Sequence, residues 1–375
     1  MDYMTLKGIW WLFVAVLVAG FMLLGGRDLG VAFLLPWVGK TDEQRRLLLN
    51  SIGPTWEGNQ VWFITTGGAL FAAWPFVYAV AFSSFYYALL LVLFALILRP
   101  PGFDYRSKLA NPFWRTGWDI AVFLSGFVPS LLFGVALGNV FLGIPFHFDD
   151  TLRAFYTGQF LNLLHPFALL VGLVSLGLCV TQGALFLNVK IADVLIQERA
   201  RRYAQGVGGL TILSFLGCGL WLRYLPGYHI VKQGNPQAML IPTHKTVVLK
   251  EGAWLDAMTT HPSLWGLVGL TCLIMLFTLL FCQRCPKKAL YGYSVAMVGA
   301  IGVAASGLFP FILPSSSHPN HSLTAWDATS SAMTLHIMFW VVVLFLPIVL
   351  LYTGYAFRMM RGPLDRRNLS GSEAY

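Results

Sequence analysis

A short polar run at the head of an apolar stretch is the part of this sequence best suited to chemistry. Residues 56–62 read Trp-Glu-Gly-Asn-Gln-Val-Trp, and apolar residues follow directly as far as Phe82. A carboxylate and two amides are costly to remove from water, so Glu57, Asn59 and Gln60 are not expected to face lipid. Their chemistry suits contact with a protein partner, a proton path or a buried polar network.

Other ionisable residues lie close to or inside apolar stretches. Arg99 ends one such stretch, and Asp104 lies shortly after it. Interfacial anchoring is one interpretation, since Arg99 can snorkel to lipid head groups and Glu57 suits a helix N-terminus. Asp28 follows Arg27 well inside a long apolar stretch, and adjacent residues on a helix point about 100° apart, so the two need not pair. We therefore expect Asp28 to face a buried polar cavity.

The composition predicts the elements that position these residues. The chain is 57% hydrophobic and 11% charged with a mean hydropathy of +0.68, whereas soluble domains carry roughly 25% charge. Because about 20 apolar helical residues cross a bilayer, we predict one all-α, polytopic membrane domain over residues 1–375. The stretches that predict about nine spans are 8–38, 59–75, 76–98, 117–141, 161–187, 204–225, 263–282, 290–312 and 334–357. The second and third are separated by Trp74-Pro75, which predicts a tight helical hairpin.

Basic residues predict the orientation in the membrane. With the N-terminus outside, 18 of the 25 Lys and Arg residues fall in cytoplasmic segments and 6 in external ones, as the positive-inside rule requires. Residues 226–262 are then an external loop, and 358–375 are a cytoplasmic tail. Topology and head-group contact account for the net charge of +9, and no basic stretch is interleaved with aromatics as a nucleic-acid surface requires. Lys7 precedes an apolar run too long for a signal peptide.

Cofactor ligands are sparse. Six of the eight histidines fall in predicted external loops, and only His165 and His336 lie in or at the ends of spans. A bis-histidine haem would need these two at one level, and a packed or capping role for each is the simpler interpretation. Cys282 and Cys285 have CxxC spacing without a second pair, so no metal site is predicted. No phosphate loop or nucleophile motif occurs, and we predict no catalytic residue in this chain.

Long motifs distributed along the whole chain carry a family resemblance. They are Ile9-Trp10-Trp11-Leu12, Asn50-Ser51-Ile52-Gly53-Pro54, residues 56–62, Gly67-Gly68-Ala69-Leu70-Phe71-Ala72-Ala73-Trp74-Pro75, Arg99-Pro100, Phe103-Asp104-Tyr105-Arg106-Ser107-Lys108, Thr181-Gln182-Gly183-Ala184, Gly252-Ala253-Trp254-Leu255, Phe309-Pro310-Phe311, Pro314-Ser315-Ser316, Leu323-Thr324 and Trp326-Asp327-Ala328-Thr329-Ser330-Ser331. The chain resembles subunit II of the cytochrome bd-type quinol oxidases, including the cyanide-insensitive branch.

The resemblance implies a haem-free subunit built as two four-helix bundles plus a peripheral helix. Its partner, subunit I, would hold haem b, haem d and the quinol-oxidising loop, and small accessory subunits join some members. The complex would oxidise membrane quinol, reduce O2 to water and draw protons from the cytoplasm, in the bacterial cytoplasmic (inner) membrane. Subunit II would stabilise the haem subunit and line part of the proton path, with lipid or a bound quinone as a further ligand.

Four residues match functional positions of the family. The resemblance places Glu57 and Asp104 on the proton path at the subunit interface, with Glu replacing the Asp of some relatives at position 57. It places Asp28 and Arg99 around a quinone or lipid cavity. Where the family often reads Asp-Gly-Phe-Asp, residues 25–28 read Gly-Gly-Arg-Asp, which weakens the case for quinone binding at this end.

Two other classes of function are open to such a chain. A structural membrane scaffold could stabilise the haem subunit with no proton role. A secondary transporter would also bury charges in broken helices, but we find no inverted pair of Gly- or Pro-interrupted spans with matching charges.

Overall fold

The chain folds into long helices that lie roughly side by side, joined by tight turns and by longer loops that carry three strand pairs. The computed structural model describes residues 1–233 and 241–365. The helices are α1 (Tyr3–Val38), α2 (Asp42–Ile52), α3 (Trp56–Ala73), α4 (Pro75–Ser84), α5 (Tyr86–Ile97), α6 (Arg99–Tyr105), α7 (Pro112–Leu142), α8 (Pro166–Lys190), α9 (Val194–Leu222), α10 (Asp256–Thr260), α11 (Ser263–Phe281), α12 (Pro286–Leu308) and α13 (Ala332–Met359). Antiparallel strand pairs join β1 (Phe146–Phe148) to β2 (Ala154–Tyr156), β3 (Pro226–Lys232) to β4 (Thr246–Glu251), and β5 (Phe311–Leu313) to β6 (Leu323–Thr324).

The predicted all-α membrane fold is confirmed. Within the described residues, eight helices are long and apolar enough to cross a membrane: α1, the joined α5 and α6, α7, α8, α9, α11, α12 and α13. The predicted span 59–75 corresponds to α3, whose first turn carries Glu57 and Asn59 and which is not among the eight. Nine crossings therefore stays a prediction.

The hairpin predicted at Trp74-Pro75 is present between α3 and α4. Pro75 is the first residue of α4, and Trp74, with φ −134° and ψ 75°, leaves the helical region. The ring centroids of Phe71 and Tyr78 lie 5.1 Å apart across the turn. One turn further along each helix, a Cβ at Gly67 would lie 4.0 Å from the Phe82 ring. The two helices are therefore antiparallel neighbours.

Several helices begin earlier than the apolar pattern indicates. α9 starts ten residues before the predicted 204, because the Asp193 carboxylate accepts from the backbone N–H groups of Leu195 and Ile196. Similarly, the Asn111 side chain caps α7 by accepting from Phe113 N. The predicted starts were wrong because polar first turns lower the local hydropathy while capping groups favour the helix.

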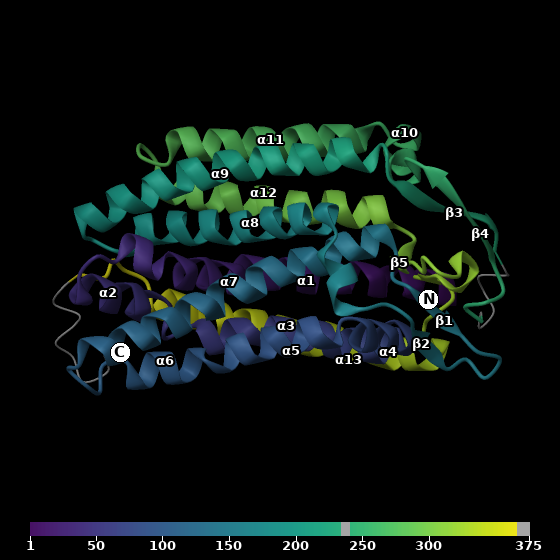
Figure 1. Cartoon of the computed structure of the whole chain (residues 1–375), viewed down its shortest axis with the longest axis horizontal. Helices are drawn as coiled ribbons and strands as arrows, with labels where there is room; N and C mark the ends of the chain where they lie inside the picture. The colour runs from purple at the N-terminus through teal and green to yellow at the C-terminus, as the bar shows by residue number, and fades with distance from the viewer. Residues whose placement is uncertain (234–240, 366–375) are drawn as a thin grey trace.

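Helix α1 is the central element. It packs on α3, α7, α8 and α12, and α13 also packs on it. Figure 1 shows α9 and α11 at the top, α8 and α12 below them, and α3, α5 and α13 at the bottom. This arrangement is compatible with the two four-helix bundles and peripheral helix that the family resemblance implies, and that layout stays a prediction.

Small residues let α1 approach its neighbours closely. A Cβ built on Gly183 of α8 would lie 2.6 Å from the Gly30 carbonyl carbon of α1, and a Cβ on Gly126 of α7 would lie 2.6 Å from Phe33 N. Any larger residue at these positions would clash with backbone rather than with a movable side chain. Such contacts are how helices associate in lipid, where no hydrophobic force drives apolar faces together.

The three strand pairs gather at one end of the molecule, and α2 and α6 lie at the other (Figure 1). At the strand end Trp254 packs against Phe141 and donates its indole N–H to the Phe141 carbonyl at 3.1 Å. The predicted external loop 226–262 contains β3, β4 and α10, with residues 234–240 outside the described part. The tail predicted from 358 is described only to residue 365. Both boundaries stay predictions.

Candidate functional site

A buried polar contact joins the middle of α1 to the first turn of α3. Asp28 and Asn59 are 1% and 2% exposed, and the Asn59 amide donates to Asp28 Oδ2 at 2.6 Å. Arg27 Nε lies 3.5 Å from Asp28 Oδ1, so the neighbours do approach one another despite their helical spacing. Asp28 is therefore held in a polar environment inside the helices, and its predicted role at a quinone or lipid cavity stays a prediction.

Arg99 lies inside the protein near this contact. Its Nε donates to Ser125 Oγ at 3.3 Å and its Nη2 to the Ser125 carbonyl at 3.0 Å. The charges of Arg99 and Asp28 also interact. Interfacial snorkelling was the wrong interpretation for Arg99, because its guanidinium is buried and satisfied by α7 rather than by head groups.

Arg27 extends from the polar contact toward the opposite side of α1. Its guanidinium lies 4.5 Å from the centroid of the Phe186 ring on α8 and 5.3 Å from that of Phe357 on α13. Cation–π contact of this kind stabilises a charge that has lost most of its water. The Arg that departs from the family pattern therefore also links α8 and α13 to α1.

Glu57 and Asp104 lie on the exposed surface of the chain. Each directly follows one of a pair of stacked rings, because Trp56 and Phe103 have centroids 5.7 Å apart and planes inclined by 25°. The stack holds the start of α3 beside α6, so the two carboxylates belong to one region of the surface. The predicted proton path at a subunit interface stays a prediction.

An ionic network that the sequence did not reveal ties α2, α6 and α7 together. The buried Asp119 carboxylate of α7 accepts from Arg106 at 2.6 Å and from Arg45 at 2.6 Å. Asp42 of α2 in turn pairs with Arg106 and Arg115, each at 2.9 Å. In the sequence these arginines indicated only a cytoplasmic loop. Their pairing fixes the end of the molecule near the Glu57 and Asp104 surface.

We expect Asp119→Asn to destabilise the protein by about 3 kcal/mol, because it leaves two arginines short of a buried partner. The thermal midpoint of the purified complex measures the effect. The matched control is Glu198→Gln, which breaks an exposed Glu198–Arg202 pair worth about 0.3–0.5 kcal/mol. Equal midpoints for the two variants would contradict a structural role for the network.

Three imidazoles cluster at the opposite end, with His147 in β1 and with His318 and His321 in the segment between β5 and β6. The ring centroids of His147 and His318, and of His318 and His321, are each 5.1 Å apart. The backbone N–H of Phe148 donates to His321 Nδ1 at 3.0 Å. Burial lowers the pKa of His321, and the charges of His318, His147 and Lys245 lower it further. The neutral ring is therefore the form that this cluster favours.

Acidification is expected to weaken this end of the protein. Above the ordinary His321 pKa of 6.5 both the folded and the unfolded chain hold a neutral ring, so stability does not depend on this group. As the pH falls below 6.5 the unfolded chain takes up the proton first, and stability falls until the lowered folded pKa is passed. His321→Gln, which keeps an acceptor for Phe148 N, should reduce this loss.

The test compares thermal midpoints of the complex at about pH 7.5 and about pH 5.5, a range in which histidine changes charge. The control is His229→Gln, at an exposed histidine of β3. The same acid sensitivity in wild type and both variants would show that His321 does not carry the effect.

The two histidines on membrane helices do not suit a shared haem. His165 accepts the backbone N–H of Phe167 at 3.2 Å and caps α8, in agreement with the capping interpretation. His336 lies on α13, which packs on α1 rather than extensively on α8. Among residues 1–233 and 241–365, no group of three or more His, Cys, Asp or Glu side chains could hold a metal ion. Cys282 is buried and Cys285 exposed, and both thiols are free.

Comparisons with known proteins agree with one another. The family model described as cytochrome bd terminal oxidase subunit II matches residues 6–360. A probable cytochrome oxidase subunit 2 of Haemophilus influenzae is 46% identical over 366 residues, covering 97% of this chain and 96% of the relative. The cytochrome bd-I ubiquinol oxidase subunit 2 of Escherichia coli K12 is 45% identical over 372 residues, covering 98% and 97%.

A solved structure extends the likeness to the fold. In the bd oxidase from Geobacillus thermodenitrificans, one chain superposes with a TM-score of 0.65 at 18% sequence identity. The match covers 95% of this chain and 100% of that one. At this identity the comparison concerns the fold alone.

Proposed function

This chain belongs to the family of cytochrome bd terminal oxidase subunit II, and we propose that it is the haem-free subunit of a complex that oxidises membrane quinol and reduces O2 to water. The family assignment makes it a membrane subunit of an oxidoreductase in respiratory electron transport, with a partner oxidase subunit. The observation that carries the proposal is the match over nearly the whole chain. With this match, a structural scaffold without a proton role stays the alternative function. A secondary transporter is no longer needed to explain the buried charges.

We place haem b and haem d in the partner subunit. Support comes from His165 and His336, which lie on helices that do not pack extensively on each other. A haem bound there would supply the electron transfer and O2 chemistry. The role of this chain would be to hold the partner, exclude water from its surface and deliver protons.

The proposed location is the bacterial cytoplasmic membrane, with the N-terminus outside. The bias of basic residues supports this orientation, since Arg45, Arg106 and Arg115 all lie in the network at the α2 and α6 end. The α2 and α6 end would then face the cytoplasm, and the strand pairs would face outward.

Glu57 and Asp104 are the proposed proton carriers. Both lie at the end that this orientation assigns to the cytoplasm, and the Trp56–Phe103 stack holds them in one region. On the isolated chain they are exposed, so a docked subunit could cover them and desolvate them. Partly desolvated carboxylates exchange protons closer to neutral pH than solvated ones, which is the property a proton path needs.

Glu57→Gln and Asp104→Asn are expected to slow quinol oxidase turnover by about tenfold or more, because an amide cannot relay a proton. Turnover is measured per haem in assembled complex, with an unchanged reduced-minus-oxidised spectrum as the criterion of assembly. Glu198→Gln, an exposed carboxylate on α9, is the control. Wild-type turnover in both variants would refute the proton path, and loss of haem from the complex would favour the scaffold.

Asp28 and Arg99 are proposed to border a cavity for a quinone or lipid head group. The support is that both are buried, one bonded to Asn59 and the other to Ser125, so a polar surface lies among apolar helices. The loss of the first acid of the family pattern and the presence of Arg27 alter this surface but leave both residues in place.

Asp28→Asn should lower the quinone or lipid retained per haem by about tenfold, since it removes a charge balanced against Arg99. The measurement is extraction and mass spectrometry of the purified complex, again with Glu198→Gln as control. Unchanged ligand content at an intact haem spectrum would show that Asp28 supports only the helix packing.

A further inference from the structure

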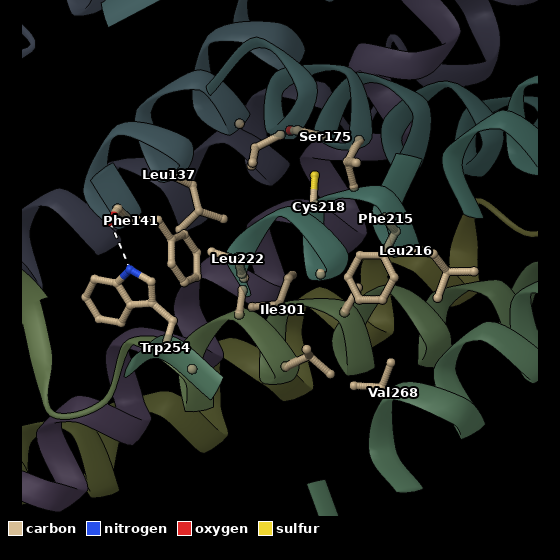
Figure 2. A pocket seen from close by; sticks show the side chains of 18 of the residues that line it. Leu137, Phe141, Ser175, Phe215, Leu216, Cys218, Leu222, Trp254, Val268 and Ile301 are labelled. Atoms are coloured by element: carbon tan, nitrogen blue, oxygen red, sulfur yellow. Dashed lines mark hydrogen bonds between the residues drawn. The ribbon is translucent and has the colours of Figure 1, made fainter. Parts of the chain in front are cut away.

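A large cavity lies among α8, α9, α11 and α12, with α1 and α7 contributing walls (Figure 2). Its volume is ≈ 550 Å³. Protein interiors are close-packed and seldom hold voids much larger than a water molecule. A volume of this size falls in the range of about 300–1,000 Å³ that is typical of ligand pockets. The packing of the chain therefore leaves room for a molecule other than itself.

The walls are almost wholly apolar. Figure 2 shows Leu137, Phe141, Phe215 and Ile301 around the space. The indole N–H of Trp254 is already donated to the Phe141 carbonyl, so it offers nothing to a ligand. Apolar cavities exclude water, because water finds no hydrogen-bond partners there. The part of any occupant that enters the cavity must be hydrocarbon.

The cavity opens to the outer surface of the apolar helices α9 and α11, because exposed residues of both helices line it. Leu216 and Leu220 of α9 and Trp265 of α11 line it, although they are 43%, 69% and 51% exposed. Arg223, directly after the end of α9, is the charged residue among its described lining, and it too is exposed. The apolar cavity thus ends beside one cation, Arg223, at the strand end of the molecule. Trp265 lies at the same opening, and tryptophan is enriched at membrane interfaces.

We propose that this cavity binds one acyl chain of a membrane phospholipid, whose phosphate pairs with Arg223. The apolar walls fit the chain, the opening beside α9 and α11 faces the bilayer that supplies it, and the cation fits the phosphate. The site is separate from the polar surface of Asp28 and Arg99, which do not line the cavity. A bound chain completes the packing of α8, α9, α11 and α12.

A substitution at Gly219 tests whether the acyl chain lies in the cavity. It lines the cavity, and a Cβ added there would meet no atom within 4 Å, so a larger side chain can enter the empty space. Gly209 is the matched control, because it lies on the same helix, also has no atom within 4 Å and does not line the cavity. Complexes carrying Gly219→Phe or Gly209→Phe are purified alongside wild type and checked by their haem spectrum.

The probe is phosphatidylglycerol with a photoreactive diazirine in its acyl chain. We expect light to crosslink it to α9 and α12 peptides of wild type and Gly209→Phe, with a loss of about tenfold in Gly219→Phe. Equal crosslinking in all three complexes, or none in wild type, would overturn the proposal. If Gly219→Phe fails to assemble, Ile301→Trp, from the opposite wall, applies the same test.

The head-group part is tested with Arg223→Gln against Arg153→Gln, an exposed arginine at the same end that does not line the cavity. Arg223→Gln should lower retention of the probe about tenfold, while Arg153→Gln should leave it unchanged. Excess ubiquinone that abolishes crosslinking where excess unlabelled phosphatidylglycerol does not would show that a quinone tail is the occupant. That result would also overturn the proposal.

Discussion

The close approach of α1 to α8 at Gly30 and Gly183 is the contact on which the rest of the structure depends. In lipid, apolar helices gain nothing from hiding their faces from water, so association relies on dense packing between small residues. Here the two backbones come so near that a Cβ on either glycine would meet main-chain atoms of the other helix. Because α1 also packs on α3, α7 and α12, a change in this contact would shift α8 relative to those helices as well.

Several of the polar groups that this packing buries have partners within the chain. Asp28 lies two residues before Gly30, and its carboxylate is bonded to Asn59 instead of to water. Arg99 uses Ser125 in the same way, and Asp119 uses Arg106. Desolvated charges are tolerated only with such pairing, which is why the first turn of α3 and the start of α6 must lie where they do. The pairing of these buried charges thus fixes the helices that carry the proposed ligand and proton sites.

The two regions with proposed functions, the Glu57 and Asp104 surface and the apolar cavity, are more accessible than these buried polar contacts. Glu57 and Asp104 project from the same short segments as Asn59 and Phe103, yet they lie on the surface, where a second subunit can reach them. The ≈ 550 Å³ cavity is the converse case, since it lies among the helices, opens beside α9 and α11 and is almost without polar atoms. The Glu57 and Asp104 surface is suited to proton transfer, and the cavity is suited to binding hydrocarbon. The two lie on different helices.

The sequence by itself determined the membrane class, the hairpin at Trp74-Pro75, the family and the burial of Asp28, because hydropathy, proline and long motifs are local signals. Tertiary structure alone decided that Arg99 is buried and that Asp119 gathers Arg45 and Arg106. These partners are 74 and 13 residues from Asp119, and no local pattern encodes such pairing. The cavity beside Gly219 was equally hidden, since it exists only where several helix faces meet without filling the space between them.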